Sequence, residues 1–444
     1  MKKFIRVIAF FIVFIFIFVA VQNVLHYRWC DNEDIYTRNI AYKNELPDSI
    51  DVMFFGTSEM YDCIFPTEMY HQNGITGINF ATQNKSAMTA YYQLKYALKY
   101  QKPKVVCCDF LAMFDPVYMP SEAETVYRKI ADTMPDLDIK YGLVRDICKL
   151  DRTESALSYY FPIFRYHTMW SELEKDNFKK DYEYNKEYNT FSKGCRLTGE
   201  EYEDSTGEFA MGDTILPEFW DKSADVSVMQ DFALDYFGKF IDLCHQNGAE
   251  VVWVLPPKIS DAFLWQASVP EIEKYCDEKG IAFIDYSSRE AVFDLGVNFI
   301  EDYYNTSHMN YKGALKVSKD LSNKLKEMYD LPDRRLDSRV SSVWDKDYDD
   351  FCKEYLYIAS DIKRECDEID GETRVVTITL KDNYPYVSVV KNYAGTEFME
   401  IIQDMEPAKE IKVRVPKDER GTIGVLVYGN PNKAVTIDAK TFEY

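Results

Sequence analysis

Ile50-Asp-Val-Met-Phe-Phe-Gly-Thr-Ser-Glu-Met60 is the stretch of sequence that decides the fold. Residues 50–55 form a short, mostly apolar run, which is typical of a buried strand. Gly56 ends the run and permits a sharp turn, because glycine has no Cβ to restrict its backbone. Ser58 follows, and a serine lifted out of a sheet edge can act as a nucleophile, with backbone N–H groups facing a developing oxyanion. The same residues allow a second interpretation, in which Ser58 caps a helix.

Short apolar runs of the same kind recur along the chain. They lie at residues 78–81, 105–110, 250–255 and 281–285. Between and after them, the spacing of apolar residues predicts helices at 87–100, 226–247, 270–279 and 311–329. Short strands that alternate with helices indicate a mostly parallel sheet covered on both faces. We therefore expect a three-layer α/β/α domain over residues 45–332.

Residues 116–225 break this alternation. They are rich in Tyr, Glu, Asp and Lys, and they contain the aromatic run Tyr159–Trp170. We interpret them as an insertion or cap over the carboxyl end of the sheet, where open α/β sheets bind ligands. Arg165 and His167 would then contact an anionic or sugar group. The alternative is a surface excursion whose aromatic residues pack on their own core, with Arg165 and His167 in packing or surface roles.

The N-terminus has the pattern of a membrane anchor. Lys2, Lys3 and Arg6 precede an uncharged, apolar stretch at residues 7–25, and about 20 such residues cross a bilayer as a helix. The positive-inside rule puts the N-terminus in the cytoplasm and the body outside it. We expect residues 1–28 to form a single-pass anchor in the cell membrane. A cleaved signal peptide is the alternative.

The C-terminal part of the chain changes character after about residue 333. A linker and a short acidic helical stretch precede runs with period-two alternation between Gly, Pro and Asn turns. The runs lie at residues 374–380, 386–390, 409–415 and 423–428. This pattern predicts a small antiparallel β module within residues 340–444.

Composition narrows the class of function. The net charge of −22 argues against a nucleic-acid partner, since such proteins carry a basic surface. The ten cysteines show no CxxC pair, and no phosphate-binding loop, dinucleotide-binding motif or HExxH motif is present. We expect neither a metal site nor a cofactor.

A serine nucleophile needs a base with a pKa near neutrality, and histidine is the usual choice. The chain has five histidines. Only His308 is expected on a loop between the last core strand and the helix that follows. Ser58 and His308 would therefore meet at one end of the α/β domain.

These residues carry a resemblance to a known superfamily. Gly56-Thr57-Ser58, with His308-Met309-Asn310 and Gly313-Ala314, resembles the SGNH (GDSL-like) hydrolases over residues 50–330. The stretches at 51–62 and 79–84 are similar to its membrane-anchored branch, which includes the D-alanyl transfer protein of teichoic-acid biosynthesis and alginate-type O-acetyltransferases.

The resemblance implies that Ser58 is the nucleophile and His308 the general base. The acid of the family's triad stands three residues before the histidine, where this chain has Asn305. Three possibilities stay open: Asp302 substitutes for the acid, a Ser–His dyad operates with Asn305 orienting the ring, or the site is slow or inactive. The family's oxyanion donors map to Gln83 and Asn84, while Asp109 stands where a Gly-x-Asn motif is expected.

The sequence thus leads to two hypotheses of function. The first is a serine acyltransferase or esterase that acts on a cell-envelope polysaccharide or teichoic-acid-like polymer, by O-acetylation or D-alanylation through an acyl-enzyme. The resemblance implies a membrane-bound O-acyltransferase as its partner. The second is an envelope scaffold or glycan-binding protein that retains the fold without the activity.

Overall fold

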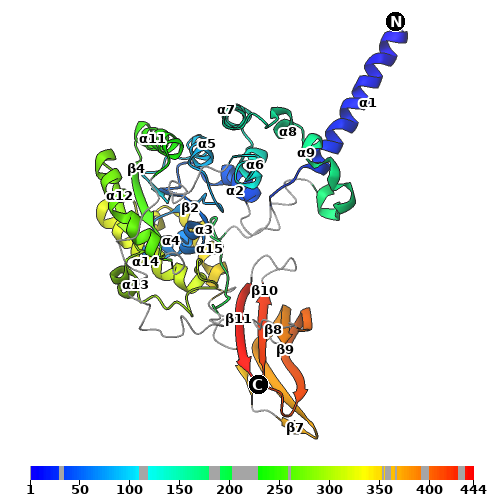
Figure 1. Cartoon of the computed structure of the whole chain (residues 1–444), viewed down its shortest axis with the longest axis vertical. Coiled ribbons are helices and arrows are strands. Elements are labelled where there is room, and N and C mark those ends of the chain that lie inside the picture. The colour runs from blue at the N-terminus through cyan, green and yellow to red at the C-terminus, as the bar shows by residue number, and fades with distance from the viewer. Residues whose placement is uncertain are drawn as a thin grey trace.

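The computed structural model describes most of the chain. The described residues are 2–29, 35–109, 119–179, 191–202, 229–258, 262–352, 355, 362–365, 368–391, 400–428 and 436–444. They form an α/β body, an N-terminal helix that projects from it, and a C-terminal β module (Figure 1).

The body is built on a parallel sheet of five strands. They are β1 (Val52–Phe55), β2 (Gly77–Asn79), β3 (Val105–Cys108), β4 (Glu250–Leu255) and β5 (Ala282–Asp285). Their order is β2-β1-β3-β4-β5, so the chain reverses its direction of sheet growth after β2. The predicted α/β class with a mostly parallel sheet is confirmed.

Helices cover both faces of the sheet because each strand alternates its side chains between two cores. In β1, Met53 and Phe55 face the core formed with α5 (Ala87–Ala97), α11 (Asp231–Gln246) and α12 (Ala262–Lys279). Val52 and Phe54 face the opposite core. That core is completed by α3 (Ser58–Cys63), α4 (Pro66–Asn73) and α14 (Tyr311–Met328); α13 (Arg289–Asp294) and its following loop join β5 to α14.

One helix boundary differs clearly from the sequence prediction. The sequence predicts a helix that begins at Pro270. Instead α12 begins at Ala262 and contains Pro270 in its interior.

The segment between β3 and β4 has two described parts. Residues 119–179 form α6 (Glu124–Thr133), α7 (Leu137–Leu150), α8 (Ala156–Tyr160), α9 (Ile163–Tyr166), η3 (His167–Glu172) and η4 (Lys175–Phe178). Of these, α6 and α7 pack beside α5, and α6 also packs against α2 (Ile35–Ala41), which η1 (Tyr42–Asn44) follows. At the other end, α9 and η4 contact the N-terminal helix. Residues 191–202 instead return to α3, where Arg196 N donates to Tyr61 O at 2.9 Å. The rest of the predicted cap lies outside the described residues.

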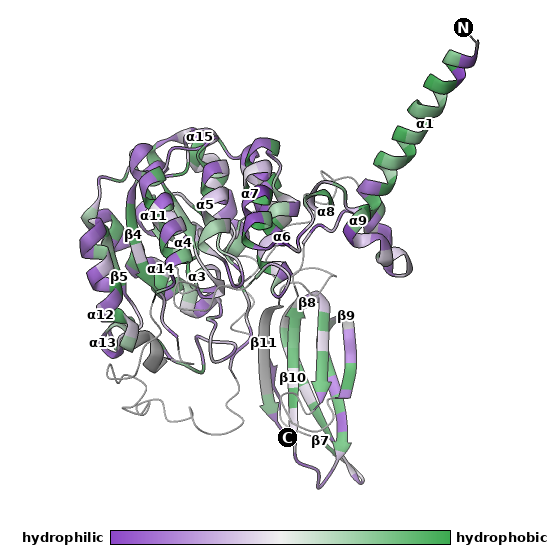
Figure 2. Ribbon diagram, turned by 45° about the horizontal axis from the view of Figure 1, so that its top comes forward, coloured by the Kyte–Doolittle hydropathy of each residue, from purple (hydrophilic) through white to green (hydrophobic). Residues whose placement is uncertain are grey.

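The N-terminal helix α1 (Lys2–Leu25) is apolar for most of its length, as its green colour in Figure 2 shows. Most of its side chains are exposed. It has a mean hydropathy of 3.1 and is the one described helix long and apolar enough to cross a membrane.

The C-terminal residues form the expected antiparallel sheet. After η6 (Arg334–Leu336) and α15 (Ser338–Phe351) come β6 (Lys363–Arg364), β7 (Glu368–Asp370), β8 (Thr373–Lys391), β9 (Glu400–Pro416), β10 (Thr422–Tyr428) and β11 (Thr436–Glu443). The runs predicted at 374–380 and 386–390 belong to one long strand, β8, which pairs with β9 through an irregular register. Phe351 packs against Phe65 of the body and belongs to the core of this module, so the two parts share apolar contacts.

Candidate active site

Ser58 stands at the first residue of α3, directly after β1 and Gly56. A Cβ on Gly56 would lie 3.0 Å from both Asp109 O and Met60 Cβ, so close backbone approach explains the glycine. The N-cap of α3 is Thr57, and it makes no side-chain capping bond. Ser58 is therefore not the helix cap that the alternative interpretation required, and its hydroxyl is directed elsewhere.

The Ser58 hydroxyl meets the imidazole of His308. Ser58 Oγ lies 2.8 Å from His308 Nε2, although the two residues are far apart in sequence. Local backbone bonds hold the histidine loop: Asn310 N donates to Asp302 O at 2.9 Å, and Tyr304 N donates to His308 O at 3.1 Å. Asn310 then caps α14, its side chain accepting from the backbone N–H groups of Lys312 and Gly313. The expectation that the two loops meet at one end of the sheet is thus met.

Asn305 fixes the tautomer of His308. Its Oδ1 accepts hydrogen bonds from the backbone N–H groups of Ser307 and His308, both at 2.9 Å, which identifies this atom as the amide oxygen. The same oxygen lies 3.0 Å from His308 Nδ1. Because an amide oxygen only accepts, Nδ1 must carry the hydrogen. The lone pair of the neutral ring is then on Nε2, where it faces Ser58.

Asp302 is placed away from the imidazole. Its Oδ2 accepts from Lys316 Nζ and from the backbone N–H of Asn298, both at 2.6 Å. Of the three possibilities left open by the sequence, the described contacts give the orienting position to Asn305. Asp302 instead ties the loop before His308 to α14.

A carboxylate, that of Glu59, lies beside the serine. Glu59 Oε2 lies 3.2 Å from Ser58 Oγ and 2.7 Å from Thr57 Oγ1, while its Oε1 accepts from Lys258 Nζ at 2.8 Å. Thr57 Oγ1 also lies 2.7 Å from Asp109 Oδ2. Burial acts to raise the pKa of Glu59, but the charge and hydrogen bond of Lys258, with the hydrogen bond to Thr57, outweigh burial and lower this pKa.

A second acidic group, Asp62, approaches the imidazole from its Nε2 side. Asp62 Oδ2 lies 4.0 Å from His308 Nε2, and Arg196 donates to both Asp62 oxygens, at 2.7 and 2.6 Å. The ring of Tyr304 stacks on His308, and its hydroxyl donates to Asp62 at 3.3 Å. Complete burial raises the pKa of Asp62 to about 7, although the Arg196 ion pair acts in the opposite direction.

Burial also decides the protonation of His308. It lowers the pKa of the imidazole to about 4, because the charged ring is poorly solvated there. The negative charge of Glu59 acts in the opposite direction, while Arg196 and Lys258 add to the lowering. At neutral pH the ring is therefore the neutral species, which is the form that can accept the serine proton.

The sequence did not single out Glu59, Asp62, Arg196 or Lys258 at this site. Arg196 and Lys258 reach it from segments far along the chain, so no local pattern marks them. Glu59 and Asp62 were visible as acidic residues next to Ser58 on a short helix, and that proximity was the one available signal.

The oxyanion candidates lie in a turn beside this site. Thr82 N donates to Gly56 O at 2.9 Å, which brings the turn after β2 next to the serine loop. Gln83 and Asn84 are exposed, and Asn84 has a positive φ of 49°. Gln83 O accepts from Lys129 Nζ at 2.5 Å. Their role as oxyanion donors stays a prediction.

Arg165 and His167 are not brought to this site. Both lie at α9 and η3, at the base of α1, and both overall views separate these elements from α3 (Figure 1). Arg165 donates to both carboxylate oxygens of Glu124, at 2.6 and 2.5 Å, and His167 is exposed. Arg165 and His167 thus lie apart from Ser58, and their contact with an anionic or sugar group stays a prediction.

Comparison with known proteins finds solved structures of low similarity to this chain. No family model and no curated protein sequence matches the chain. Similar solved structures include a protein of the G-D-S-L family, described as lipolytic, from Desulfitobacterium hafniense DCB-2; it has 10% identity and a TM-score of 0.28, over 62% of this chain and 98% of that one. A GDSL-like lipase from Bacteroides thetaiotaomicron VPI-5482 has 10% identity and a TM-score of 0.30, over 66% and 97%.

A third similar structure is a gut microbial diltiazem-metabolizing enzyme, with 6% identity and a TM-score of 0.27, over 77% of this chain and 59% of that one. Scores of this size do not carry a functional assignment. The chemistry of Ser58 and His308 therefore rests on the geometry of these two residues.

Proposed function

We propose that this chain is a membrane-anchored serine acyltransferase or esterase of SGNH type that acts on a glycopolymer of the cell envelope. The observation that carries the proposal is the 2.8 Å contact between Ser58 Oγ and His308 Nε2, with Nδ1 held by Asn305. Covalent acyl chemistry is typically carried out by a nucleophile that is hydrogen-bonded to a base, when that base is in turn hydrogen-bonded to an orienting group.

The proposed reaction has two half-steps. Ser58 Oγ attacks the carbonyl carbon of an acyl donor while its proton passes to His308 Nε2. The tetrahedral intermediate collapses, and His308 returns that proton to the leaving oxygen, which leaves the acyl group on Ser58 as an ester. A hydroxyl of the polymer then attacks this ester with His308 as the base, and Ser58 recovers its proton. Water in place of the polymer makes the same site an esterase.

The acidic groups around Nε2 compensate for the neutral partner at Nδ1. Asn305 orients the ring without lending a negative charge to the imidazolium that forms during attack. Glu59 lies next to the serine and raises the pKa of His308, which means that it stabilises the charged ring. Asp62 is 4.0 Å from Nε2 and adds to this when ionised. We infer that these two carboxylates take over part of the role of a triad acid.

The proposed polymer substrate and the proposed anchor are connected by their shared location at the membrane. An apolar helix at the N-terminus would hold the active site near membrane-made polymers and raise its effective concentration there. A membrane-bound O-acyltransferase that delivers the acyl group across the bilayer is the proposed partner. The apolar helix supports this scheme by length and composition.

A second candidate function is a non-catalytic envelope scaffold or glycan-binding protein. Asn305 at the position of the triad acid is the observation that favours it. The two candidates differ in one respect that is easily measured, since only the first forms a covalent acyl-serine.

The test uses the full chain in nanodiscs with an aryl acetate as donor. Ser58→Ala should lower turnover on the order of a thousandfold, because the remaining site has no nucleophile. Ser342→Ala is the matched control, since this serine is exposed on α15 and donates to Arg339 O at 3.1 Å. Normal turnover in Ser58→Ala would refute the proposal. Adding candidate polymers and counting acyl groups on polymer against free acetate then separates transfer from hydrolysis.

A further inference from the structure

Short helical segments pack against the C-terminal part of α1. Residues 156–178, which comprise α8, α9, η3 and η4, are called the collar below. The ring of Phe18 on α1 contacts that of Phe161 at 5.8 Å, and Gln22 Oε1 accepts from the backbone N–H of Ile163 at 3.0 Å. η4 packs against α1 as well. The collar thus contacts the side of α1, before the helix ends.

These contacts set the depth of the collar if α1 spans a bilayer. The 24 residues of α1 rise roughly 36 Å, against a hydrocarbon core of about 30 Å. Lys2, Lys3 and Arg6 belong at the cytoplasmic surface, so the outer end of the helix is needed to complete the span. Phe18 lies two turns before Leu25, roughly 10 Å below that end. Phe161 is therefore held at or below the level of the headgroups.

The collar presents apolar side chains to its surroundings. The exposed fractions are 55% for Leu157, 57% for Phe164, 55% for Trp170 and 67% for Phe178. The rings of Phe161 and Phe164 are in contact at 6.1 Å, so the apolar surface of α1 continues onto α9. Large apolar groups that continue from an apolar helix are costly in water and favourable in lipid.

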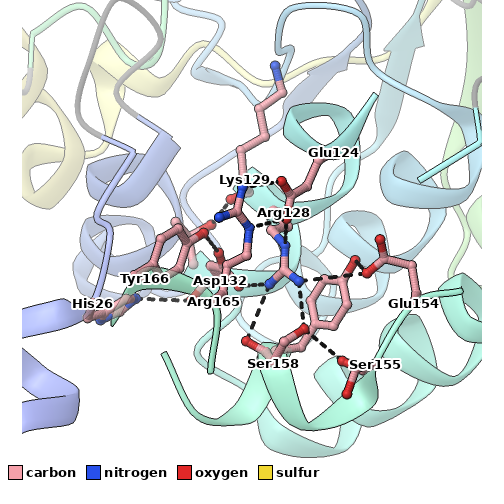
Figure 3. A network of polar contacts seen from close by, with 12 residues as sticks. His26, Glu124, Arg128, Lys129, Asp132, Glu154, Ser155, Ser158, Arg165 and Tyr166 are labelled. Atoms are coloured by element: carbon pink, nitrogen blue, oxygen red, sulfur yellow. Dashed lines mark hydrogen bonds and ion pairs between the residues drawn. The ribbon is translucent and has the colours of Figure 1, made fainter. Parts of the chain in front are cut away.

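A buried polar network joins the collar to the body, so it cannot swing freely (Figure 3). Arg128 of α6 is 3% exposed, donates to Ser158 Oγ at 2.6 Å and lies 3.9 Å above the ring of Tyr159. Glu124 and Glu154 add ion pairs with the same guanidinium.

The same network reaches the chain where it leaves α1. Asp132 of α6 accepts from Tyr166 OH at 2.5 Å and from Trp29 Nε1 at 3.4 Å, and His26 Nε2 lies 3.3 Å from Asp132 O. Polar contacts with α6 therefore connect the end of α1, the collar and the body.

We propose that the collar is a second membrane-contacting element, inserted into the headgroup and upper acyl region of the outer leaflet. In-plane segments with aromatic residues bury roughly 5–10 Å at this boundary, which agrees with the depth set by Phe18. Tryptophan and tyrosine are enriched there. The partner is the lipid surface itself, and the outcome is a body held at a fixed height and orientation. The proposal rests on α1 spanning the membrane and is independent of the chemistry at Ser58.

The test measures Trp170 fluorescence in the full chain. Wild type and Trp170→Phe are reconstituted in nanodiscs of phosphatidylcholine, with or without bromine on the upper acyl chain. Subtracting the emission of the variant from that of the wild type gives the emission of Trp170 alone. We expect most of this emission to be lost in brominated discs. Equal emission in both discs, or quenching of Trp170 by aqueous iodide instead, would overturn the proposal and point to a protein partner or to water as the occupant.

A second variant checks the result without relying on tryptophan. Phe164→Asp puts a charge at the lipid boundary and should increase hydrogen exchange over residues 157–178 in nanodiscs. Phe293→Asp is the matched control, because Phe293 is 48% exposed on α13, away from the collar. Equal exchange in the two variants would count against insertion. If the chain does not incorporate into nanodiscs, both the membrane span of α1 and the insertion of the collar are refuted. Turnover of an aryl acetate by the same chain still tests the role of Ser58.

Discussion

His308 Nδ1 lies 3.0 Å from Asn305 Oδ1, an oxygen that two backbone N–H groups already identify as an acceptor. The ring therefore has the tautomer that a carboxylate would impose, but without the carboxylate's charge. An asparagine whose amide nitrogen faced the ring would impose the wrong tautomer, and this loop prevents that orientation. The site keeps the geometry of a triad and places its negative charge beside Nε2 instead.

Replacing Asn305 with aspartate should raise activity. The substitution keeps the acceptor at Nδ1 and adds a charge that stabilises the imidazolium. We expect kcat for an aryl acetate to rise about tenfold, equivalent to about 1.4 kcal/mol. Asn305→Leu removes the acceptor and should lower kcat. The prediction fails if Asn305→Asp is slower than the wild type while Asn305→Leu is unchanged.

The loss of kcat/KM at low pH, the acid limb of the pH profile, should have its midpoint near pH 4. Burial lowers the pKa of His308 to about 4 from the ordinary value of about 6.5. The base works only when neutral, so activity is retained as the pH falls and is lost below about 4. An acid limb at about 6.5 would show that the ring is solvated in the working enzyme.

Two charge changes should move that limb in opposite directions. Glu59 raises the pKa of His308, so Glu59→Gln should lower it and shift the limb to more acidic pH. Lys258 lowers the same pKa, so Lys258→Met should shift the limb to higher pH. Each variant serves as the control for the other. Shifts of the same sign in both would contradict the electrostatic account of the site.

Removing Arg196 should destabilise the fold through Asp62. The carboxylate of Asp62 is fully buried and receives two hydrogen bonds from Arg196. Breaking one side of a buried ion pair costs about 3 kcal/mol, so Arg196→Met should unfold at a clearly lower temperature. The double variant Arg196→Met, Asp62→Asn leaves no unpaired charge and should recover part of the loss. Equal melting of the wild type and Arg196→Met would contradict this.

A methyl group at Gly56 should disturb the serine loop. The added Cβ would meet Asp109 O and Met60 Cβ at 3.0 Å, so the backbone before Ser58 must shift. We expect Gly56→Ala to lower kcat at least about tenfold, since small displacements of a nucleophile are costly. Gly238→Ala on α11 is the matched control, because its Cβ would meet nothing within 4 Å. It should be neutral or slightly stabilising.

The sequence predicted the parallel sheet and the pairing of Ser58 with His308, because both depend on local signals. A strand that ends in Gly56 and Ser58, and a histidine just before α14, can be recognised from neighbouring residues. Ser58 follows the end of a strand and His308 precedes the start of a helix. The order of the strands in the sheet then determines where these two residues lie.

The polar surroundings of the site were not predictable in the same way. Arg196 reaches Asp62, and Lys258 reaches Glu59, across long stretches of chain. On the sequence these residues look like ordinary surface charges. For Arg165 the sequence left both a ligand contact and a packing or surface role open, and the structure pairs its guanidinium with Glu124 near the base of α1.

Labelling with a fluorophosphonate tests the central claim most directly, since the probe phosphonylates a serine only when a base activates it. In the full chain, peptide mass spectrometry should find the adduct on Ser58. Labelling should be absent in Ser58→Ala, strongly reduced in His308→Ala and unchanged in Ser342→Ala. A folded wild-type chain that takes up no probe, or one labelled equally with and without His308, would contradict the account.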